Sequence, residues 1–410
     1  MDYGLIGEKL GHSFSKEIHE RFNRYSYSLK ELAPDEVQKF MTEKPFKGIN
    51  VTIPYKQTVI PYLDYVDQTA QRIGAVNTIV NRGGKLYGYN TDYYGFKYLL
   101  NSSNIQVNGK TVAILGSGGA SKMANCALMD LGAKKILTVS RNGDVNYANI
   151  KDRKDTQVIV NASPVGMYPN NGECLVELTE FPLLESVVDM VYNPFVTELL
   201  RRANALGVKT ANGLPMLVAQ AKRACELFTG KDVPDSLTER IITAVKKQTL
   251  NITLVGMPGS GKTTFGNRLS QLLDREFIDA DQEFYSLHGV TAGEYIERNG
   301  ERAFRDEEEK VLSGLLKQSR KIIATGGGAV IREQNRINMR ANSVVVWIER
   351  DLSELAKDGR PLSNKYGTEK LYQDRYPLYS SVSDIRFIND GAVTGKAESL
   401  LGLIEKYFGE

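Results

Sequence analysis

The chain has 410 residues, a length typical of two or three domains, and its 41% apolar and 25% charged residues are ordinary for a globular protein. Neither half is basic enough to predict a nucleic-acid partner, since residues 1–248 carry 30 basic and 25 acidic side chains and residues 249–410 carry 22 and 24. No run of 18 apolar residues predicts a membrane-spanning helix, and the N-terminus has no signal-peptide pattern. Three scattered cysteines show neither disulfide nor metal-ligand spacing, so we expect a cytoplasmic protein.

The first 250 residues alternate short apolar runs with helical patterns, which predicts an α/β fold. "YGLIG" at 3–7 and "GINVTIP" at 48–54 are typical of strands, and "SFSKEIHERFNRY" at 13–25 is typical of a helix. Residues 110–142 are more regular, because an apolar strand, a glycine-rich turn, a helix and a second strand make a βαβ unit. "TQVIVNASP" and "ESVVDMVYN" predict further buried parallel strands.

The glycine-rich turn of this βαβ unit predicts a dinucleotide site. Its small residues, which let a pyrophosphate approach the helix N-terminus, are Gly116, Gly118, Gly119 and Ala120. Ser121 replaces the third glycine of the usual fingerprint, so the pattern alone is weak. A tight turn that binds no ligand is the alternative interpretation.

The end of the second strand favours NADP over NAD. NAD sites usually place an acidic residue there to accept hydrogen bonds from the ribose hydroxyls, but this chain has Arg141. A guanidinium cannot accept from a hydroxyl, whereas it can pair with a 2′-phosphate. A solvated surface arginine is the alternative.

Seven segments resemble shikimate dehydrogenases and follow that family's order: "HSFSKEIH", "GINVTIPYK", "GAVNTIV", "GYNTDYYGF", "LGSGGASK", "VVDMVYNPFVTELL" and "GLPMLVAQA". The resemblance implies that Ser13 and Ser15 bind the shikimate carboxylate. It implies that the rest of the substrate pocket is lined by Thr52, Asn77, Tyr192 and Gln220. It also implies that Met190 and Gly213 flank the nicotinamide and that Ser140 and Arg141 hold the adenosine phosphate.

The same resemblance implies that Lys56 and Asp92 are the catalytic pair. Reduction of a ketone places negative charge on the carbonyl oxygen, which an ammonium can stabilise and protonate. A nearby carboxylate keeps that ammonium oriented and charged. From spacing alone, a solvated lysine and a turn-forming aspartate would be the preferred interpretation.

"GMPGSGKT" at 256–263 is a phosphate-binding loop, with an apolar strand before it and a helix after it. We expect Lys262 to bridge the β- and γ-phosphates of ATP and Thr263 to bind Mg²⁺. The expected nucleotide contacts are Gly259, Ser260, Gly261, Lys262, Thr263 and Thr264.

Further segments resemble shikimate kinases across residues 250–410: "FIDADQEF", "ERAFRDEEE", "ATGGGAV", "GRPL" and "DRYPLY". The resemblance implies that the acceptor carboxylate is clamped by Arg305 and Arg375, with backbone N–H groups at Gly327 and Gly328. It implies that Asp281 accepts from the attacking hydroxyl and that Asp279 holds Mg²⁺ through water. Arg360 would act from a mobile lid. The alternatives are helix caps for the aspartates and a pairing of Arg305 with Glu308 or Glu309 on its own helix.

Together these patterns predict a two-lobed dehydrogenase followed, after a short linker at about 247–250, by a P-loop kinase. The expected domains are a catalytic lobe (1–100 plus 213–247), a Rossmann lobe for NADP (101–212) and a kinase (248–410). The expected function is NADPH-dependent reduction of 3-dehydroshikimate followed by phosphorylation of shikimate by ATP. A catalytically inactive ligand sensor and an NAD-linked quinate or shikimate dehydrogenase are the alternatives, and the oligomeric state stays open between monomer and homodimer.

Overall fold

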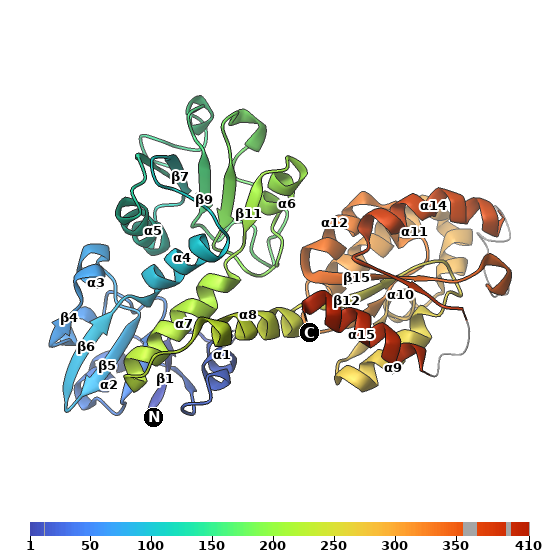
Figure 1. Cartoon of the computed structure of the whole chain (residues 1–410). Coiled ribbons are helices and arrows are strands. Elements are labelled where there is room, and N and C mark those ends of the chain that lie inside the picture. Colours follow the sequence, from blue (N-terminus) through green and yellow to red (C-terminus); the bar gives the residue numbers. More distant parts are fainter. Residues whose placement is uncertain (12, 356–366, 391–394, 410) are drawn as a thin grey trace. The chain divides into compact units, whose positions relative to one another are not determined.

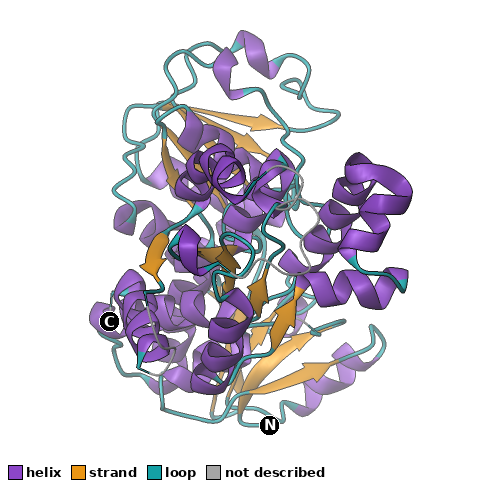
Figure 2. Cartoon of the chain, turned by 90° about the vertical axis from the view of Figure 1, so that its right-hand side faces the viewer, coloured by secondary structure: helices purple, strands orange, loops and turns teal. Residues whose placement is uncertain are grey.

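The computed structural model describes residues 1–11, 13–355, 367–390 and 395–409, and it divides the chain into two compact units, Met1–Val245 and Lys246–Glu410 (Figure 1). The first unit contains two sheets and the second unit contains one. Helices pack against the strands in both units (Figure 2). The predicted α/β class is therefore confirmed.

The first sheet of the first unit is mixed, with the strand order β2-β1-β3-β5-β6-β4. Strand β1 is parallel to β2 and β3, whereas β5 is antiparallel to β3 and β6. Its strands are β1 (Tyr3–Gly7), β2 (Ser28–Glu31), β3 (Gly48–Val51), β4 (Tyr65–Val66), β5 (Thr78–Arg82) and β6 (Lys85–Tyr89). The helices of this part are α1 (Ser15–Arg21), α2 (Glu36–Glu43) and α3 (Gln68–Ile73). Helix α1 is shorter than the predicted range 13–25.

The second sheet is fully parallel, with the strand order β11-β10-β9-β7-β8. Its strands are β7 (Thr111–Leu115), β8 (Lys135–Val139), β9 (Val158–Asn161), β10 (Ser186–Asp189) and β11 (Lys209–Ala211), and its helices include α5 (Gly119–Asp130) and α6 (Glu198–Ala205). Alternate residues of β7 enter different cores: Ile114 packs with α5, and Leu115 packs with α6. Burial on both faces explains why these strands read as continuous apolar runs.

Two long helices, α4 (Thr91–Ser102) and α7 (Leu214–Thr229), pack closely against each other. Gly95 permits this approach, because a Cβ atom there would lie 2.6 Å from the carbonyl oxygen of Met216. Helix α8 (Asp235–Thr249) follows and contains neither glycine nor proline. The division between the two compact units falls inside this helix, and Leu250 alone separates its last residue from the first strand of the second unit.

The sheet of the second unit is also parallel, with the order β13-β14-β12-β15-β16. Its strands are β12 (Asn251–Val255), β13 (Phe277–Asp279), β14 (Ile322–Ala324), β15 (Ser343–Glu349) and β16 (Ile385–Ile388). Its helices are α9 (Lys262–Leu273), α10 (Ala280–His288), α11 (Ala292–Leu316), α12 (Glu333–Asn342), α14 (Thr368–Val382) and α15 (Lys396–Phe408). Helices α9 and α15 cover one face, and α11 and α12 cover the other (Figure 1).

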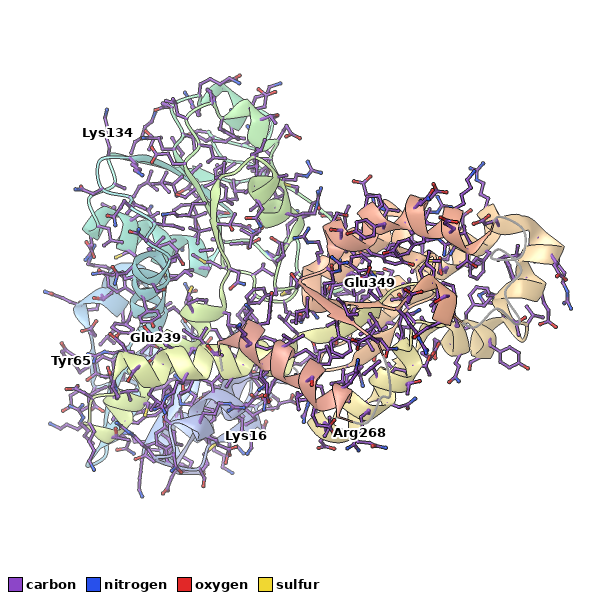
Figure 3. All side chains as sticks on the ribbon, turned by 45° about the vertical axis from the view of Figure 1, so that its right-hand side comes forward. Lys16, Tyr65, Lys134, Glu239, Arg268 and Glu349 are labelled. Carbon is purple, nitrogen blue, oxygen red and sulfur yellow. The ribbon has the colours of Figure 1, made fainter. Side chains whose placement is uncertain are left out.

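Polar contacts join neighbouring elements at the rim of this sheet. Arg268 of α9 forms an ion pair of 2.9 Å with Glu398 of α15. Glu349, at the end of β15, accepts hydrogen bonds from Arg386 of β16 and Tyr372 of α14, at 2.6 and 2.7 Å (both Arg268 and Glu349 are labelled in Figure 3). Among the residues that the structure describes, no helix combines the length and apolarity needed to cross a membrane.

Candidate functional site

Lys56 and Asp92 meet in the first unit although 36 positions separate them in the sequence. The ammonium Nζ of Lys56 donates to Oδ2 of Asp92 at 2.6 Å. Their side chains keep 31% and 21% of their exposure, so water reaches both groups. The arrangement gives a charged, oriented proton donor that can exchange protons with solvent.

Local backbone contacts place this pair. The N–H of Val76 donates to the carbonyl of Lys56 at 2.8 Å, which fixes the loop after β3. Asn90 caps helix α4 by accepting from the N–H of Tyr93, and its amide donates to the carbonyl of Ala75. Asp92 therefore sits in the first turn of a helix that is tied to the same segment as Lys56.

Asn77, Thr91 and Gln220 form a second polar group within this unit. Asn77 is only 3% exposed, and its Oδ1 accepts from the N–H of Thr91 at 2.7 Å. Thr91 Oγ1 lies 3.4 Å from Oε1 of Gln220 on α7. The predicted pocket residues Asn77 and Gln220 are thus linked through Thr91, the residue before Asp92, which the sequence did not single out.

The four other predicted pocket residues lie at or near the ends of elements. Thr52 follows β3, where its N–H donates to the carbonyl of Ile6 at 3.0 Å. Ser13 accepts from the N–H of Ser15 at the start of α1. The ring of Phe14 contacts Tyr192 edge-on at 5.9 Å, which brings Tyr192 to the Ser13–Ser15 turn. Burial raises the pKa of Tyr192, so its hydroxyl stays protonated.

The predicted dinucleotide turn lies between β7 and α5. Gly116 has a φ of +117°, which favours glycine, and Gly118 stands directly before the helix. Gly118, Gly119 and Ala120 are exposed, and a Cβ atom at Gly118 or Gly119 would meet nothing within 4 Å. The backbone N–H groups of this helix N-terminus are therefore open to an anion.

Ser140 and Arg141 follow β8, the strand next to β7, so their backbone lies at the same edge of the sheet as the glycine turn. Ser140 is half-buried and Arg141 is exposed. Met190 and Gly213 are in close contact at the neighbouring strand ends: a Cβ atom at Gly213 would lie 2.0 Å from the Met190 carbonyl oxygen. Only glycine allows this approach.

Asp189 anchors the Met190 segment and was missed in the sequence, although it lies within the quoted "VVDMVYN". Its buried carboxylate accepts from Asn161 Nδ2 at 2.9 Å, from the Val191 N–H at 3.0 Å and from Thr197 Oγ1 at 2.6 Å. Burial raises its pKa to about 6 despite these donors. A polar residue at the end of an apolar strand was the available signal.

The phosphate loop of the second unit joins β12 to α9, and Gly256, Gly259 and Gly261 all have positive φ. Lys262 is buried and donates to the carbonyls of Gly256 and Met257 at 3.0 Å each. Ser260 is also buried, whereas Thr263 and Thr264 are exposed.

Thr263 contacts the expected metal residue directly. Its hydroxyl donates to Oδ2 of Asp279 at 2.8 Å. The other oxygen of Asp279 caps α10 by accepting from the N–H of Asp281, so the capping alternative is observed for Asp279. Two adjacent hard oxygen donors are the ligand type that Mg²⁺ prefers.

Asp281 lies among charged groups at the base of the second unit's site. Asp281 as a residue is exposed, but the protein atoms packed around its carboxylate raise its pKa, and so does the nearby Asp279 carboxylate, while Lys262 and Arg305 oppose the rise. Asp281 and Glu308 both approach Gly326, where a Cβ atom would lie 2.9 Å and 2.8 Å from their oxygens. Gly326 is thus a site residue that the sequence interpretation passed over in favour of the next two glycines.

Arg305 pairs with Glu308 at 2.7 Å, and each side chain is only 7% exposed. The predicted alternative pairing with Glu308 is therefore present, but it lies inside the site and not on a solvated face. A Cβ atom at Gly328 would lie 2.2 Å from Nη2 of Arg305, so the guanidinium rests against the glycine turn. Glu301 approaches the same guanidinium at 3.4 Å.

Arg375 and Tyr379 of α14 hold the other side of the glycine turn. Arg375 is 4% exposed and donates to the Gly327 carbonyl at 3.2 Å, and the Tyr379 hydroxyl donates to the same oxygen. These contacts fix the turn between β14 and the short 3₁₀ helix Ala329–Ile331. Arg360 lies outside the described residues.

Comparisons with known proteins place both units. Residues 5–79 match the family model "Shikimate dehydrogenase substrate binding domain", and residues 213–246 match "Shikimate 5'-dehydrogenase C-terminal domain". The NADP(+) shikimate dehydrogenase of Clostridium perfringens (strain 13 / Type A) is 37% identical over 265 residues, which cover 60% of this chain and 98% of the relative. The chain belongs to the shikimate dehydrogenase family. Residues 258–405 match the "Shikimate kinase" model.

Solved structures agree with the dehydrogenase assignment. Shikimate dehydrogenase 1 from Peptoclostridium difficile is 38% identical, with a TM-score of 0.55 over 60% of this chain and 98% of that one. The enzyme from Thermus thermophilus, in complex with NADP(H) and shikimate, is 30% identical, with a TM-score of 0.54 over 60% of this chain and 99% of that one. With a kinase domain behind the dehydrogenase, the chain is a bifunctional shikimate-pathway enzyme.

Proposed function

We propose that the first unit reduces 3-dehydroshikimate to shikimate with NADPH and that the second unit phosphorylates shikimate to shikimate 3-phosphate with ATP and Mg²⁺. The observation that carries the proposal is the 2.6 Å contact of Lys56 with Asp92, in a family member whose chain also matches the shikimate kinase model over residues 258–405. The product of the first reaction is then the substrate of the second.

In the dehydrogenase step, NADPH supplies a hydride to the substrate's carbonyl carbon. The C=O π electrons move to the oxygen, and Lys56 donates a proton from Nζ to that oxygen. Asp92 holds the ammonium in line and stabilises its charge before transfer. Solvent then reprotonates Lys56, because both side chains are partly exposed. The substrate is held by the predicted pocket residues Ser13, Ser15, Thr52, Asn77, Tyr192 and Gln220.

The residues present fit NADP(H). The open helix N-terminus at Gly118–Ala120 suits the pyrophosphate, and the exposed Arg141 suits a 2′-phosphate. Gly213 packs against Met190 at the neighbouring strand ends, where we propose that the nicotinamide binds. A quinate dehydrogenase from Corynebacterium glutamicum in complex with NAD is 28% identical, so the NAD-linked alternative is an outcome that the assay below separates.

In the kinase step, Asp281 orients the acceptor hydroxyl and takes its proton as the oxygen attacks the γ-phosphorus of ATP. The bond from that phosphorus to the bridging oxygen breaks, and ADP leaves. A carboxylate with a raised pKa suits the role of base. Arg305 and Arg375 hold the substrate carboxylate beside Gly327 and Gly328. Thr263 and Asp279 would hold Mg²⁺, which neutralises phosphate charge. Lys262 exchanges its hydrogen bonds to the loop carbonyls for contacts with the nucleotide phosphates. Arg360 neutralises charge on the phosphoryl group as it is transferred.

A coupled assay tests the whole proposal. The chain receives 3-dehydroshikimate, NADPH, ATP and Mg²⁺, and NADPH loss is followed together with shikimate 3-phosphate. Lys56→Ala should block NADPH oxidation but still phosphorylate added shikimate, whereas Lys262→Ala should stop at shikimate. The activity that each variant keeps therefore shows that its chain has folded, and each variant serves as a control for the other.

Two results would overturn the proposal. A parent chain that binds these ligands but turns over neither is a sensor, and the site residues then describe binding only. A parent that prefers NADH and quinate supports the NAD-linked alternative.

A further inference from the structure

A continuous row of buried polar side chains leads through the first sheet to the proposed substrate pocket. We name it the polar chain, and in order it consists of Tyr27, Asn50, Thr78, Asn77, Thr91 and Gln220. The first five are at most 5% exposed. No pocket role has been assigned to Tyr27, Asn50 or Thr78. Burial of a polar group is unfavourable unless a hydrogen bond compensates for it, and the polar chain supplies these bonds.

Backbone groups fix the orientation of the three amides in the polar chain. Asn50 Nδ2 donates to the Asn77 carbonyl at 3.3 Å, and Gln220 Nε2 donates to the Leu217 carbonyl at 2.9 Å. Asn77 Oδ1 accepts from the N–H of Thr91 at 2.7 Å. A backbone carbonyl can only accept and a backbone N–H can only donate, so none of these amides can flip without losing its partner.

The fixed amides then determine in which direction the hydroxyl groups of Tyr27 and Thr78 donate their hydrogen bonds. Tyr27 must donate to Asn50 Oδ1, at 2.6 Å, because that oxygen only accepts. Asn50 Nδ2 donates to Thr78 Oγ1 at 2.9 Å, so the single Thr78 proton points onward, to Asn77 Oδ1 at 3.2 Å or Thr91 Oγ1 at 3.1 Å.

The last links reach Gln220 through Thr91. Asn77 Nδ2 donates to Thr91 Oγ1 at 3.1 Å, and the Thr91 hydroxyl has two acceptors within reach, Asn77 Oδ1 at 3.3 Å and Gln220 Oε1 at 3.4 Å. Each of the two pocket amides uses one of its N–H protons within the described residues, and the other is left for a ligand oxygen.

We propose that Asn50 and Thr78 are positioning residues of the dehydrogenase. Asn50 Nδ2 donates to the Asn77 carbonyl and the Thr78 hydroxyl can donate to Asn77 Oδ1, so together they hold Asn77 in place and leave its remaining N–H for an acceptor oxygen of the substrate. The proposal rests on the proposed function of this unit. It predicts that the polar chain affects substrate binding without contact with substrate and without effect on the cofactor.

The test compares Thr78→Val with Thr78→Ser in the full chain, with shikimate and NADP⁺ and without ATP. Val keeps the shape of Thr and removes the hydroxyl, whereas Ser keeps the hydroxyl. We expect Thr78→Val to raise the KM for shikimate about tenfold, because one buried partner is lost, and Thr78→Ser to stay within about twofold. The KM for NADP⁺ and the kinase activity of the same chains should not change.

Asn50→Ala is the second variant and serves if Thr78→Val fails to fold. It removes the donor Nδ2 without placing a charge in the core, so the Asn77 carbonyl and the Thr78 hydroxyl each lose a partner. We expect a similar increase in the KM for shikimate. Equal KM values for Thr78→Val, Thr78→Ser and the parent, or a common loss that follows thermal stability alone, would overturn the inference and leave the enzyme assignment intact. A parent that oxidises no shikimate would overturn the proposed function and the inference with it.

Discussion

The buried carboxylate of Asp189 makes the stability of the first unit depend on pH. Burial raises its pKa from an ordinary 3.8 to about 6, so the folded chain binds a proton between these values that the unfolded chain has released. The stability from this proton is present below pH ~4 and is lost as the pH rises through about 6. The difference corresponds to about 3 kcal/mol.

Asp189→Asn should remove this dependence. The amide keeps the shape, and its Oδ1 can still accept from Asn161 and Val191, while the Thr197 hydroxyl can rotate to accept. We therefore expect the parent's first unit to lose about 6–12 °C in Tm between pH 4 and 7 relative to Asp189→Asn. Asp152→Asn, an exposed change of the same charge, should behave as the parent.

The single tryptophan separates the two units in this measurement. Trp347 is buried in the second unit, so fluorescence excited at 295 nm reports kinase unfolding, whereas circular dichroism reports both units. Only the circular dichroism transition of the first unit should differ between parent and variant. Parallel pH profiles for the parent and Asp189→Asn would show that the carboxylate is ionised throughout and would refute the reasoning.

Three further predictions concern single contacts. Gly213→Ala should lower the kcat/KM of the dehydrogenase about a hundredfold in steady-state kinetics, because the added Cβ displaces the Met190 backbone; normal rates would exclude that contact. Arg141→Ser should raise the KM for NADPH at least tenfold and leave that for NADH unchanged; equal effects on both would identify a plain surface arginine. Glu308→Gln should raise the kinase KM for shikimate about tenfold by releasing Arg305 from its position, while the half-buried Glu309→Gln on the same helix should not; identical values would contradict the role of the pair.

Sequence reasoning worked best where function is local. The phosphate loop, the glycine turn and the element types around them follow from the residues themselves, because a strand, a turn and a helix N-terminus are contiguous. The Lys56–Asp92 contact is different, since nothing in a spacing of 36 residues predicts a distance of 2.6 Å. It was reached only through the resemblance to a family.

Burial of charged residues could not be predicted in the same way. The run "RDEEEK" is typical of a solvated helix face, and three of its acidic residues stay exposed or half-buried. Of the four acidic residues, only Glu308 is buried, on the same face of α11 as Phe304 and Leu312. Phe304 lies four residues before Glu308 and Leu312 lies four residues after it, and this helical spacing was the available signal.

The charged pairs of the two units differ in their exposure to water, and the chemistry of the two reactions explains the difference. Lys56 and Asp92 are 31% and 21% exposed, whereas Arg305 and Glu308 are each 7% exposed. A lysine that gives its proton to an alkoxide must recover one from water in each turnover, so partial exposure is useful to the dehydrogenase. A kinase that binds an activated phosphoryl group must keep water away, because water competes with the acceptor hydroxyl.

The buried pair of the kinase therefore has two opposed effects on substrate affinity. Glu308 holds the Arg305 guanidinium against the glycine turn before any substrate arrives, and it also competes with the substrate carboxylate for the same N–H groups. A guanidinium has five N–H donors, so it can keep Glu308 and still offer donors to a second carboxylate. Positioning should then outweigh competition, which is why Glu308→Gln is expected to raise the KM for shikimate. A lower KM in that variant would show that competition dominates.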